Sequence, residues 1–405
     1  MSGVARAGAQ DDRQKMSDRP SGPEREGERD PVSDPAVEPA SDVAAAPGCE
    51  RRGGPDAPGP VPGSGPRRFA RLRPGDRVAV VAPSGPPDPA RLSAGCELLS
   101  RLGLEVTVAP HALDRTGLAG PVDGPGRAGW QRLAGGDADR AADLQEAWCD
   151  PGVRAVLCAR GGYGATRLLG LLDWDAIAEA GRGTAPKILH GSSDITALHA
   201  AFGARLGITT SFGPMPAGEL LAEARGEDHD LSLEYFRQVL FAPDSGPEPA
   251  SGPAAGGLAE AAPALTGTRA LRPGRAEGPL TGGTLSLLTA LLGTPDQPPP
   301  AAGKIVFLED VSEAPYRIDR MLTQLLASGW LDGAAGFALG GWTGCGDPEE
   351  VEAVLEARLA PLGAPILAGL PVGHGPRQLT LELGAPYRLD TGALTLAASA
   401  RGGAR

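Results

Sequence analysis

A serine, a carboxylate and a histidine, the three residue types that many hydrolases combine, occur in separate motifs of this chain. Ser193 stands in Lys187-Ile-Leu-His-Gly-Ser-Ser-Asp-Ile-Thr196, where an apolar run leads into a glycine and then into a helical pattern. A serine on such a strand-to-helix turn has an exposed hydroxyl beside unpaired backbone N–H groups. Glu309 follows an apolar run and His374 lies between two glycines. The three residues can form a triad, because the roles depend on geometry and not on sequence position.

Local sequence also allows simpler interpretations of the serine turn. Ser192 and Ser193 are typical helix N-cap residues, and Asp194 is equally suited to that role. If Ser193 is instead the nucleophile, the backbone N–H of Asp194 lies at the positive end of the following helix, where it can face a developing oxyanion.

The carboxylate and the histidine have alternatives of their own. Glu309 and Asp310 are adjacent acids that can be an ordinary exposed pair or bind a metal, but no histidine lies near them in the sequence. We therefore prefer Glu309 as the group that orients a histidine. Of the five histidines, only His374 sits in a glycine-flanked loop between predicted strands, and loops of that kind often carry catalytic side chains.

A glycine-rich turn, Arg160-Gly-Gly-Tyr-Gly164, directly follows another apolar run. Glycines let a backbone approach a ligand closely. The pattern does not fit the Gly-x-Gly-x-x-Gly of dinucleotide sites. It is compatible with a plain tight turn, with an anion cradle, or with a second oxyanion donor from Gly161 or Gly162.

Composition limits the classes of function. The 405 residues carry a net charge of −12, which argues against nucleic-acid binding because such surfaces are usually basic. The five cysteines form no CxxC pair, so we expect reduced thiols and no structural zinc site. No run reaches the ~20 apolar residues of a membrane helix, and the N-terminus lacks a signal pattern. We expect a cytoplasmic protein that binds neither membranes nor nucleic acid.

The first 68 residues differ from the remainder of the chain. Residues 1–68 contain no Leu, Ile, Phe, Trp or Tyr and many Pro, Gly and charged residues. Such a segment cannot bury enough apolar surface to offset its ordering entropy. We predict a disordered tail without a function of its own, and Met16 is a second candidate start beside Met1.

The elements that must position the candidate residues begin near Phe69. Apolar runs at 77–82, 104–108 and 153–159 predict strands, and leucine spacing predicts a helix over 89–102. The alternation indicates an α/β domain with a parallel sheet over 69–241, which carries the nucleophile. Ligands of such sheets bind beyond the carboxyl ends of the strands. The predicted turns at those ends are 83–87, 160–164 and 191–194.

A break rich in Pro, Gly and Ala covers residues 242–279. We predict a flexible linker with a mobile insertion there. The second apolar block, 280–400, has a strand at 305–308 and ends in two segments, 379–383 and 393–396, that alternate like antiparallel strands. This block is predicted to be a C-terminal mixed, β-rich domain that carries Glu309 and His374.

Several short motifs stand in a fixed order along the chain. They are Val81-Ala-Pro-Ser-Gly85, Ala159-Arg-Gly-Gly-Tyr-Gly164, Gly191-Ser-Ser-Asp-Ile-Thr196, Gly213-Pro-Met215, Leu291-Leu-Gly-Thr-Pro295, Leu308-Glu-Asp310 with Pro315-Tyr-Arg-Ile-Asp-Arg320, and Gly369-Leu-Pro-Val-Gly-His374. Together they resemble the LD-carboxypeptidase family of serine peptidases, from about Gly75 to Gly384. The chain departs from the family at Thr284, where members often carry Asn, and its insertion at 242–279 looks longer than usual.

The resemblance implies a Ser-His-Glu triad, an oxyanion hole, and an active site between an α/β N-terminal domain and a β-rich C-terminal domain. It also implies a homodimer and a reaction that needs no metal or nucleotide cofactor. The residues concerned are Ser193 as nucleophile, Glu309 as triad acid, His374 as triad base, and the N–H groups of Asp194 and of Gly161 or Gly162 as oxyanion donors.

On this basis the sequence predicts a serine carboxypeptidase that releases the C-terminal D-alanine of a murein tetrapeptide or a similar small peptide. The substrate carboxylate needs a cation, and an arginine can bind it bidentately. Two alternatives stay open. One is an immunity or detoxifying amidase that acts on peptidyl-nucleotide antibiotics of the microcin C7 type, and the other is a non-catalytic anion-binding module. Candidate substrate-binding residues are Arg160, Tyr163, Arg317, Arg320, Trp342 and Arg377.

Overall fold

The structure, a computed structural model, describes residues 65–121, 131–222, 226–243 and 263–399. Residues 1–64 of the predicted tail lie outside these ranges. The structure differs from the expected disorder at the last residues of that tail. Arg67 forms a parallel bridge with Ile208, and Arg68 makes an ion pair of 2.5 Å with Glu382. Both partners are distant in sequence, so local composition gave no sign of them.

The first sheet has six strands in the order β12–β5–β4–β3–β1–β2. Strands β1 to β5 pair in parallel, as the alternation of elements predicted, and β12 joins β5 in antiparallel pairing. Parallel neighbours bring the carboxyl ends of their strands to one edge of the sheet. The strands are β1 Arg77–Val81, β2 Glu105–Val108, β3 Val153–Cys158, β4 Ile188–Gly191, β5 Thr210–Phe212 and β12 Leu381–Leu383.

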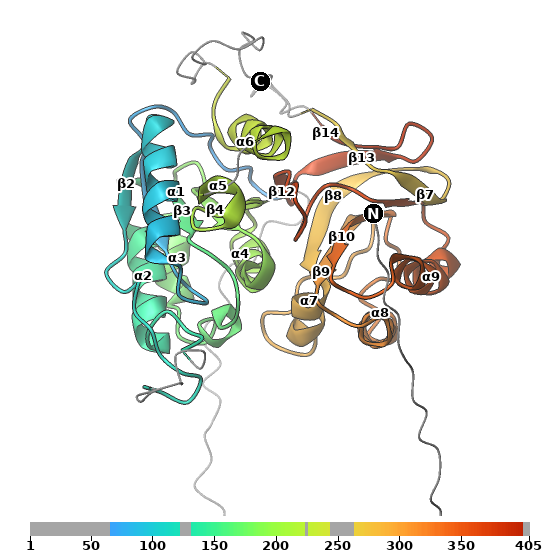
Figure 1. The fold of residues 1–405 in the computed structure, drawn as a ribbon, viewed down its shortest axis with the longest axis horizontal. Coiled ribbons are helices and arrows are strands. Elements are labelled where there is room, and N and C mark those ends of the chain that lie inside the picture. Colours follow the sequence, from blue (N-terminus) through green and yellow to red (C-terminus); the bar gives the residue numbers. More distant parts are fainter. Residues whose placement is uncertain (1–64, 122–130, 223–225, 244–262, 400–405) are drawn as a thin grey trace, which may run out of the picture. The chain divides into compact units, whose positions relative to one another are not determined.

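Helices cover both faces of this sheet (Figure 1). Val78 and Val80 of β1 pack in one apolar cluster, while Ala79 and Val81 pack in another on the opposite face. Successive side chains of a strand point to opposite faces, which is why a continuous apolar run fits a sheet buried on both sides. The helices are α1 Pro89–Arg101, α5 Glu219–Ala222 and α6 Glu227–Leu240 on the first face, and α2 Asp137–Cys149, α3 Trp174–Ala180 and α4 Thr196–Leu206 on the second.

The second sheet has eight strands in the order β6–β14–β13–β8–β9–β10–β11–β7. Its four central strands, β8 to β11, are parallel, and antiparallel strands flank them on both sides. This confirms the predicted mixed, β-rich C-terminal region. The strands are β6 Leu265–Thr266, β7 Arg269–Arg272, β8 Arg275–Thr284, β9 Ile305–Val311, β10 Gly336–Thr343, β11 Ile366–Ala368, β13 Pro386–Asp390 and β14 Thr395–Ala398.

The structure differs from the sequence-based expectation in the segment predicted to be a flexible linker. Within 242–279, residues 265–279 supply β6, β7 and the first half of β8, while residues 244–262 lie outside the described part. Gly278 explains why glycine content misled the prediction. A Cβ at Gly278 would overlap the carbonyl of Gly303, so this glycine permits close contact between segments and does not mark mobility. The domain boundaries at 241 and 280 stay a prediction.

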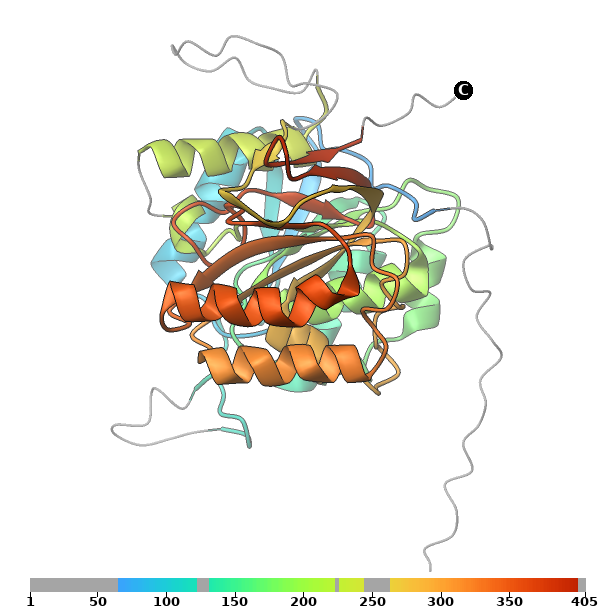
Figure 2. The same ribbon diagram turned by 90° about the vertical axis from the view of Figure 1, so that its right-hand side faces the viewer.

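Three helices, α7 Leu285–Leu291, α8 Pro315–Ala327 and α9 Pro348–Leu359, pack on one face of the second sheet, and Figure 2 shows α8 and α9 in front of it. On the other face, Phe307 of β9 meets Phe212 of β5 edge-on, with ring centroids 5.2 Å apart. The two sheets therefore share an apolar cluster. Among the helices of the described ranges, none combines the length and the apolar character needed to cross a membrane.

Candidate active site

Ser193 follows Ser192 after the end of β4 and begins a single 3₁₀ turn (Ser193–Ile195) that continues into α4. Its φ of 61° is in the left-handed region, which costs an L-residue roughly 1–2 kcal/mol. A nucleophile on a strand-to-helix elbow typically has this strained backbone. Ser192 occupies the N-cap position of this turn, but its side chain makes no capping hydrogen bond.

Asp194 does not cap the helix through its side chain either, because its carboxylate holds neighbouring turns together. One of its oxygens accepts hydrogen bonds from Ser84 Oγ at 2.6 Å and from the Ala165 N–H at 2.8 Å. The side chain is buried, and burial raises the pKa of Asp194 despite these bonds. Ser84 and Ala165 follow β1 and β3, so Asp194 fixes the serine turn to two other turns at the same sheet edge.

The glycine turn after β3 passes directly against Ser193. A Cβ placed on Gly161 would lie 2.8 Å from Ser193 Cβ and 3.2 Å from Ser193 Oγ. Gly162 has a φ of 112°, which L-residues rarely adopt. Among the hydrogen bonds of the described residues, none uses the N–H of Gly161, Gly162 or Asp194. The residue type at 161 is therefore set by close approach to the serine, and these N–H groups are available to a ligand.

Arg140 holds the glycine turn through a hydrogen bond to the Gly164 carbonyl. This residue was not identified from the sequence. The side chain is 1% exposed, and its guanidinium donates to the carbonyls of Pro83 and Gly164 and to the carboxylate of Asp137. Burial lowers the pKa of Arg140, while Asp137 opposes that effect. A single arginine in an amphipathic helix carries no sequence signal for such a role.

Gly161 gives a first prediction about stability. Replacing Gly161 by Ala should lower the free energy of unfolding by about 1–3 kcal/mol, because the new methyl group collides with Ser193. Gly170→Ala is the matched control, since a Cβ there meets no atom within 4 Å, and it should change stability by less than about 0.5 kcal/mol. Urea unfolding of both variants measures the difference. Equal stabilities would contradict the close approach.

Glu309 and His374 form a hydrogen-bonded pair near the carboxyl end of β9. Glu309 ends the apolar part of β9 and is 0% exposed, whereas the side chain of His374 is 25% exposed. The Glu309 Oε2 atom lies 2.7 Å from His374 Nδ1 and accepts the backbone N–H of His374 at 3.2 Å. With Nδ1–H donating to the carboxylate, Nε2 of the ring carries a lone pair that can accept a proton.

Two opposing effects act on the pKa of His374. Burial lowers the pKa of His374, but the hydrogen bond and the negative charge of Glu309 outweigh it, so the net pKa is raised.

Gly373, with a φ of 102°, lies against the Glu309 carboxylate. A larger residue at 373 would collide with the acid, which explains the glycine before the histidine.

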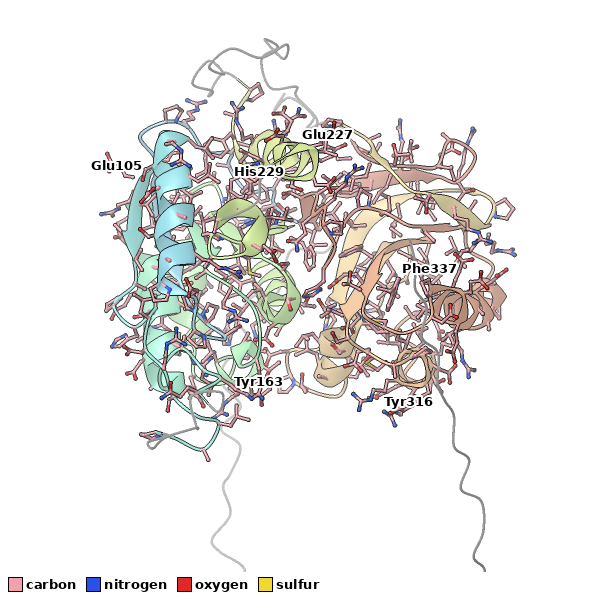
Figure 3. All side chains as sticks on the ribbon, viewed as in Figure 1. Glu105, Tyr163, Glu227, His229, Tyr316 and Phe337 are labelled. Atoms are coloured by element: carbon pink, nitrogen blue, oxygen red, sulfur yellow. The ribbon has the colours of Figure 1, made fainter. Side chains whose placement is uncertain are left out.

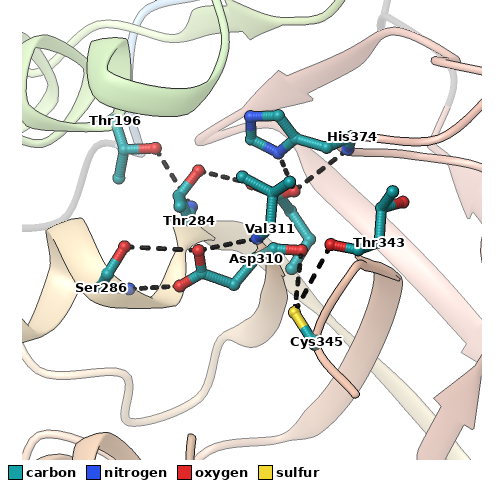
Figure 4. A network of polar contacts seen from close by, with 9 residues as sticks. Thr196, Thr284, Ser286, Asp310, Val311, Thr343, Cys345 and His374 are labelled. Atoms are coloured by element: carbon teal, nitrogen blue, oxygen red, sulfur yellow. Dashed lines mark hydrogen bonds and ion pairs between the residues drawn. The ribbon is translucent and has the colours of Figure 1, made fainter. Parts of the chain in front are cut away.

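Thr284 connects the acid to the segment that carries the serine (Figure 4). Its hydroxyl donates to Glu309 Oε1, and its backbone N–H donates to Thr196 Oγ1 at 3.1 Å. Thr196 is the first residue of α4, three positions after Ser193. In the sequence, Thr284 stands out only as a departure from the LD-carboxypeptidase pattern. In the structure it contacts both halves of the candidate site.

Asp310 has a role separate from that of its neighbour. Its carboxylate accepts the Ser286 N–H at 2.8 Å, at the start of α7, and the Val311 N–H at 2.8 Å. Burial raises the pKa of Asp310 to about 6. Glu309 and Asp310 thus contact different partners, and they are not an exposed pair. Within the described ranges, no group of three or more His, Cys, Asp and Glu side chains is arranged to hold a metal ion.

The structure brings Ser193 beside Gly161 and brings Glu309 beside His374. Among the described residues, no hydrogen bond joins Ser193 Oγ to the ring of His374. The two pairs are linked through Thr196 and Thr284 instead. The direct contact between Ser193 and His374 in the predicted triad therefore stays a prediction.

The candidate substrate-binding residues lie in different surroundings. Arg160 donates to the Pro86 carbonyl at 3.1 Å and has no acidic partner among the described residues. Arg317 is exposed and contacts Glu313 and Tyr316, and Arg377 pairs with Asp228. Arg320 stacks over Tyr316. Tyr163, which is labelled in Figure 3, is 47% exposed.

Trp342 packs against the apolar cluster under α8 and α9, and its indole nitrogen is buried without a hydrogen-bond partner among the described residues. The ring is half-buried. These contacts are those of a packing residue, and a role of Trp342 in substrate binding stays a prediction.

Comparison with known proteins identifies relatives that span the described region. Residues 78–213 match the LD-carboxypeptidase N-terminal domain and residues 277–389 match the LD-carboxypeptidase C-terminal domain. A putative carboxypeptidase of Streptomyces coelicolor is 49% identical over 332 residues, which cover 81% of this chain and 96% of that protein. A probable murein peptide carboxypeptidase of Bacillus subtilis is 35% identical over 325 residues, 79% of this chain and 90% of that protein.

A solved structure supports the fold alone. The crystal structure of an MccF-like protein from Bacillus anthracis superposes with a TM-score of 0.66 at 23% identity. The superposition covers 82% of this chain and 99% of that one. The arrangement of both sheets is thus the one found in that protein.

Proposed function

Because the chain belongs to the LD-carboxypeptidase family of serine peptidases, we propose that it releases the C-terminal D-alanine from murein tetrapeptides. The observation that carries the proposal is the 2.7 Å hydrogen bond between Glu309 and His374, coupled through Thr284 to the segment that holds Ser193 in a left-handed backbone. The 35% identity to a probable murein peptide carboxypeptidase supports the substrate class.

The proposed reaction has two steps. His374 Nε2 takes the hydroxyl proton as Ser193 Oγ attacks the amide carbonyl, and Glu309 stabilises the resulting imidazolium. The C–N bond then breaks, and His374 gives its proton to the leaving amine of D-alanine. Water, activated by the same histidine, attacks the acyl-serine ester and restores the hydroxyl. The cycle consumes one water and yields a tripeptide and D-alanine.

The oxyanion of each tetrahedral intermediate needs donors that are already in position. The N–H groups of Asp194 and of Gly161 or Gly162, which have no partner in the described part of the chain, support this role beside Ser193. One such donor is worth roughly 3–4 kcal/mol of barrier in other serine hydrolases.

Among the arginines, Arg160 has the best support as the cation for the substrate carboxylate. It adjoins Gly161, and among the described residues no carboxylate neutralises it, whereas Arg377 and Arg317 contact acids. Burial, together with the charges of Arg115 and Arg91, lowers the pKa of Arg160, so an incoming carboxylate would relieve repulsion between cations.

The murein assignment is tested by incubating the full chain with a disaccharide tetrapeptide and measuring released D-alanine by mass spectrometry. We expect tripeptide and D-alanine in equal amounts, and none with Ser193→Ala. A peptidyl-adenylate analogue serves as the second substrate. Cleavage of that analogue alone would replace the murein assignment by the detoxifying one. Full function of Ser193→Ala would instead favour a non-catalytic binding module.

The state of the protein in the cell is part of the proposal. We propose a cytoplasmic homodimer. The described cysteines, Cys96, Cys149, Cys158 and Cys345, are all free thiols, as expected in a reducing compartment. Light scattering should give about twice the mass of the 41.1 kDa chain, and a mass of one chain would contradict the dimer.

Thr284 gives a prediction about activity that rests on this mechanism. Thr284→Val removes the hydroxyl that donates to Glu309 and leaves a buried acceptor unpaired, so kcat should fall about tenfold. Thr284→Ser should retain most activity. Thr289→Val in α7, the helix that begins after Thr284, is the control, because among the described residues the Thr289 hydroxyl bonds only the Leu285 carbonyl. Equal losses in Thr284→Val and Thr289→Val would point to general damage of α7 instead.

A further inference from the structure

A cavity of about 580 Å³ lies between α4 and β8, and its lining includes none of Ser193, Glu309 and His374. It runs along α4 from His199 in the first turn to Leu206 and Gly207 at the end. We propose that this cavity binds an amphipathic anion, a carboxylate on a hydrocarbon body, for which decanoate serves as the probe. The proposal concerns binding alone and does not depend on the proposed function.

The walls of the cavity are mainly apolar. Leu206, Ile208, Leu280, Leu288 and Pro298 contribute side chains from both halves of the fold. Ligand sites are typically concave spaces of roughly 300–1,000 Å³ with apolar walls and a few polar groups. The size and lining therefore suit a small ligand with a hydrocarbon body.

The charged side chains that line the cavity determine which ligand head group fits it. Lys304 lines it, and the only hydrogen bond of its ammonium among the described residues is a long one, 3.4 Å, to the Pro299 carbonyl. Burial lowers the pKa of Lys304. Arg67 also lines the cavity without an acidic partner among the described residues, whereas nearby Arg205 is neutralised by Asp296 at 2.7 Å. Two cations and no acid in the lining favour an anionic head.

Polar groups at the walls complete the site. The hydroxyls of Thr210 and Thr281 make no hydrogen bond among the described residues. The ring of His199, 4% exposed, donates from Nε2 to the Gly191 carbonyl at 3.0 Å, and its Nδ1 has no partner in the described part of the chain. Burial lowers the pKa of His199 to about 4, so the ring is neutral. Its resonances can report occupation of the cavity.

The test measures binding of decanoate to the full chain by calorimetry, with octanoate and decylammonium as probes of chain length and charge. We expect one decanoate per chain, bound about 15-fold more tightly than octanoate because two methylenes are buried. Decylammonium should not bind. The imidazole NMR signals of His199 should shift, while those of His190, which is outside the lining, should not.

Two kinds of variant locate the site. Ala204→Trp fills the cavity from α4 and should abolish binding. Lys304→Met should weaken decanoate about tenfold, and Lys304→Arg should restore it. Lack of saturable binding, equal binding of decylammonium, or unchanged affinity in Lys304→Met would overturn the proposal. If Ala204→Trp does not fold, the comparison of Met and Arg at position 304 decides.

Discussion

Replacing Ser193 by Ala is expected to lower kcat for D-alanine release by roughly 10⁴- to 10⁶-fold, as removal of a serine nucleophile does in other hydrolases. The proposed mechanism has no second group that could form the acyl intermediate. The fold should persist, because Asp194 still binds Ser84 and Ala165 and the helix after the turn is unchanged. Mass spectrometry measures the rate of D-alanine release, and circular dichroism of the variant measures whether the fold is retained.

Ser192→Ala is the matched control for this experiment. Ser192 is adjacent, buried, and makes no capping bond, so its replacement should keep activity within about tenfold of the wild type. If Ser192→Ala were inactive and Ser193→Ala active, the nucleophile would have to be reassigned to the preceding residue.

The second large effect concerns the Glu309–His374 pair. Glu309→Gln should lower kcat by roughly 10³- to 10⁴-fold, because the ring loses the group that fixes its tautomer and stabilises its charge. It should also change the pH profile. In the wild type, kcat/KM should rise with pH through a histidine pKa above the usual value of 6.5, since only neutral His374 can accept a proton.

The direction in which Glu309→Gln should change the apparent pKa follows from the two effects on His374. Burial lowers its pKa and Glu309 raises it. Without the charge of Glu309, the charge of Asp310 is the remaining cause that opposes burial, so the apparent pKa should fall and kcat/KM should reach its plateau at lower pH. Rates over pH 5 to 9 test this. An unchanged apparent pKa would mean that the profile reports a different group.

Much of the candidate site could be predicted because its residues stand in local patterns. Ser193 follows an apolar strand, His374 stands between glycines, and Gly161 belongs to a turn after a strand. Each pattern reflects the backbone conformation or the close packing that its position requires. The parallel sheet of the N-terminal half was predicted for the same reason, since alternating strands and helices leave few topologies.

The remainder depended on contacts between distant segments. Strand β12 pairs with β5 across some 170 residues of chain, and no local pattern encodes that partner. Arg140 and Thr284 act through groups that only the fold brings to them. Glycine content was misleading at Gly278, because close packing between strands and flexibility both select glycine.

The central claim is that Ser193 and His374 act in one step, and a double-mutant cycle tests it most directly. The rates of D-alanine release are compared for Ser193→Ala, His374→Ala and the double variant, with folding checked for each. If the two residues act as a unit, the double variant should be no slower than the slower single variant. Losses that multiply in the double variant would show two independent roles and contradict the account.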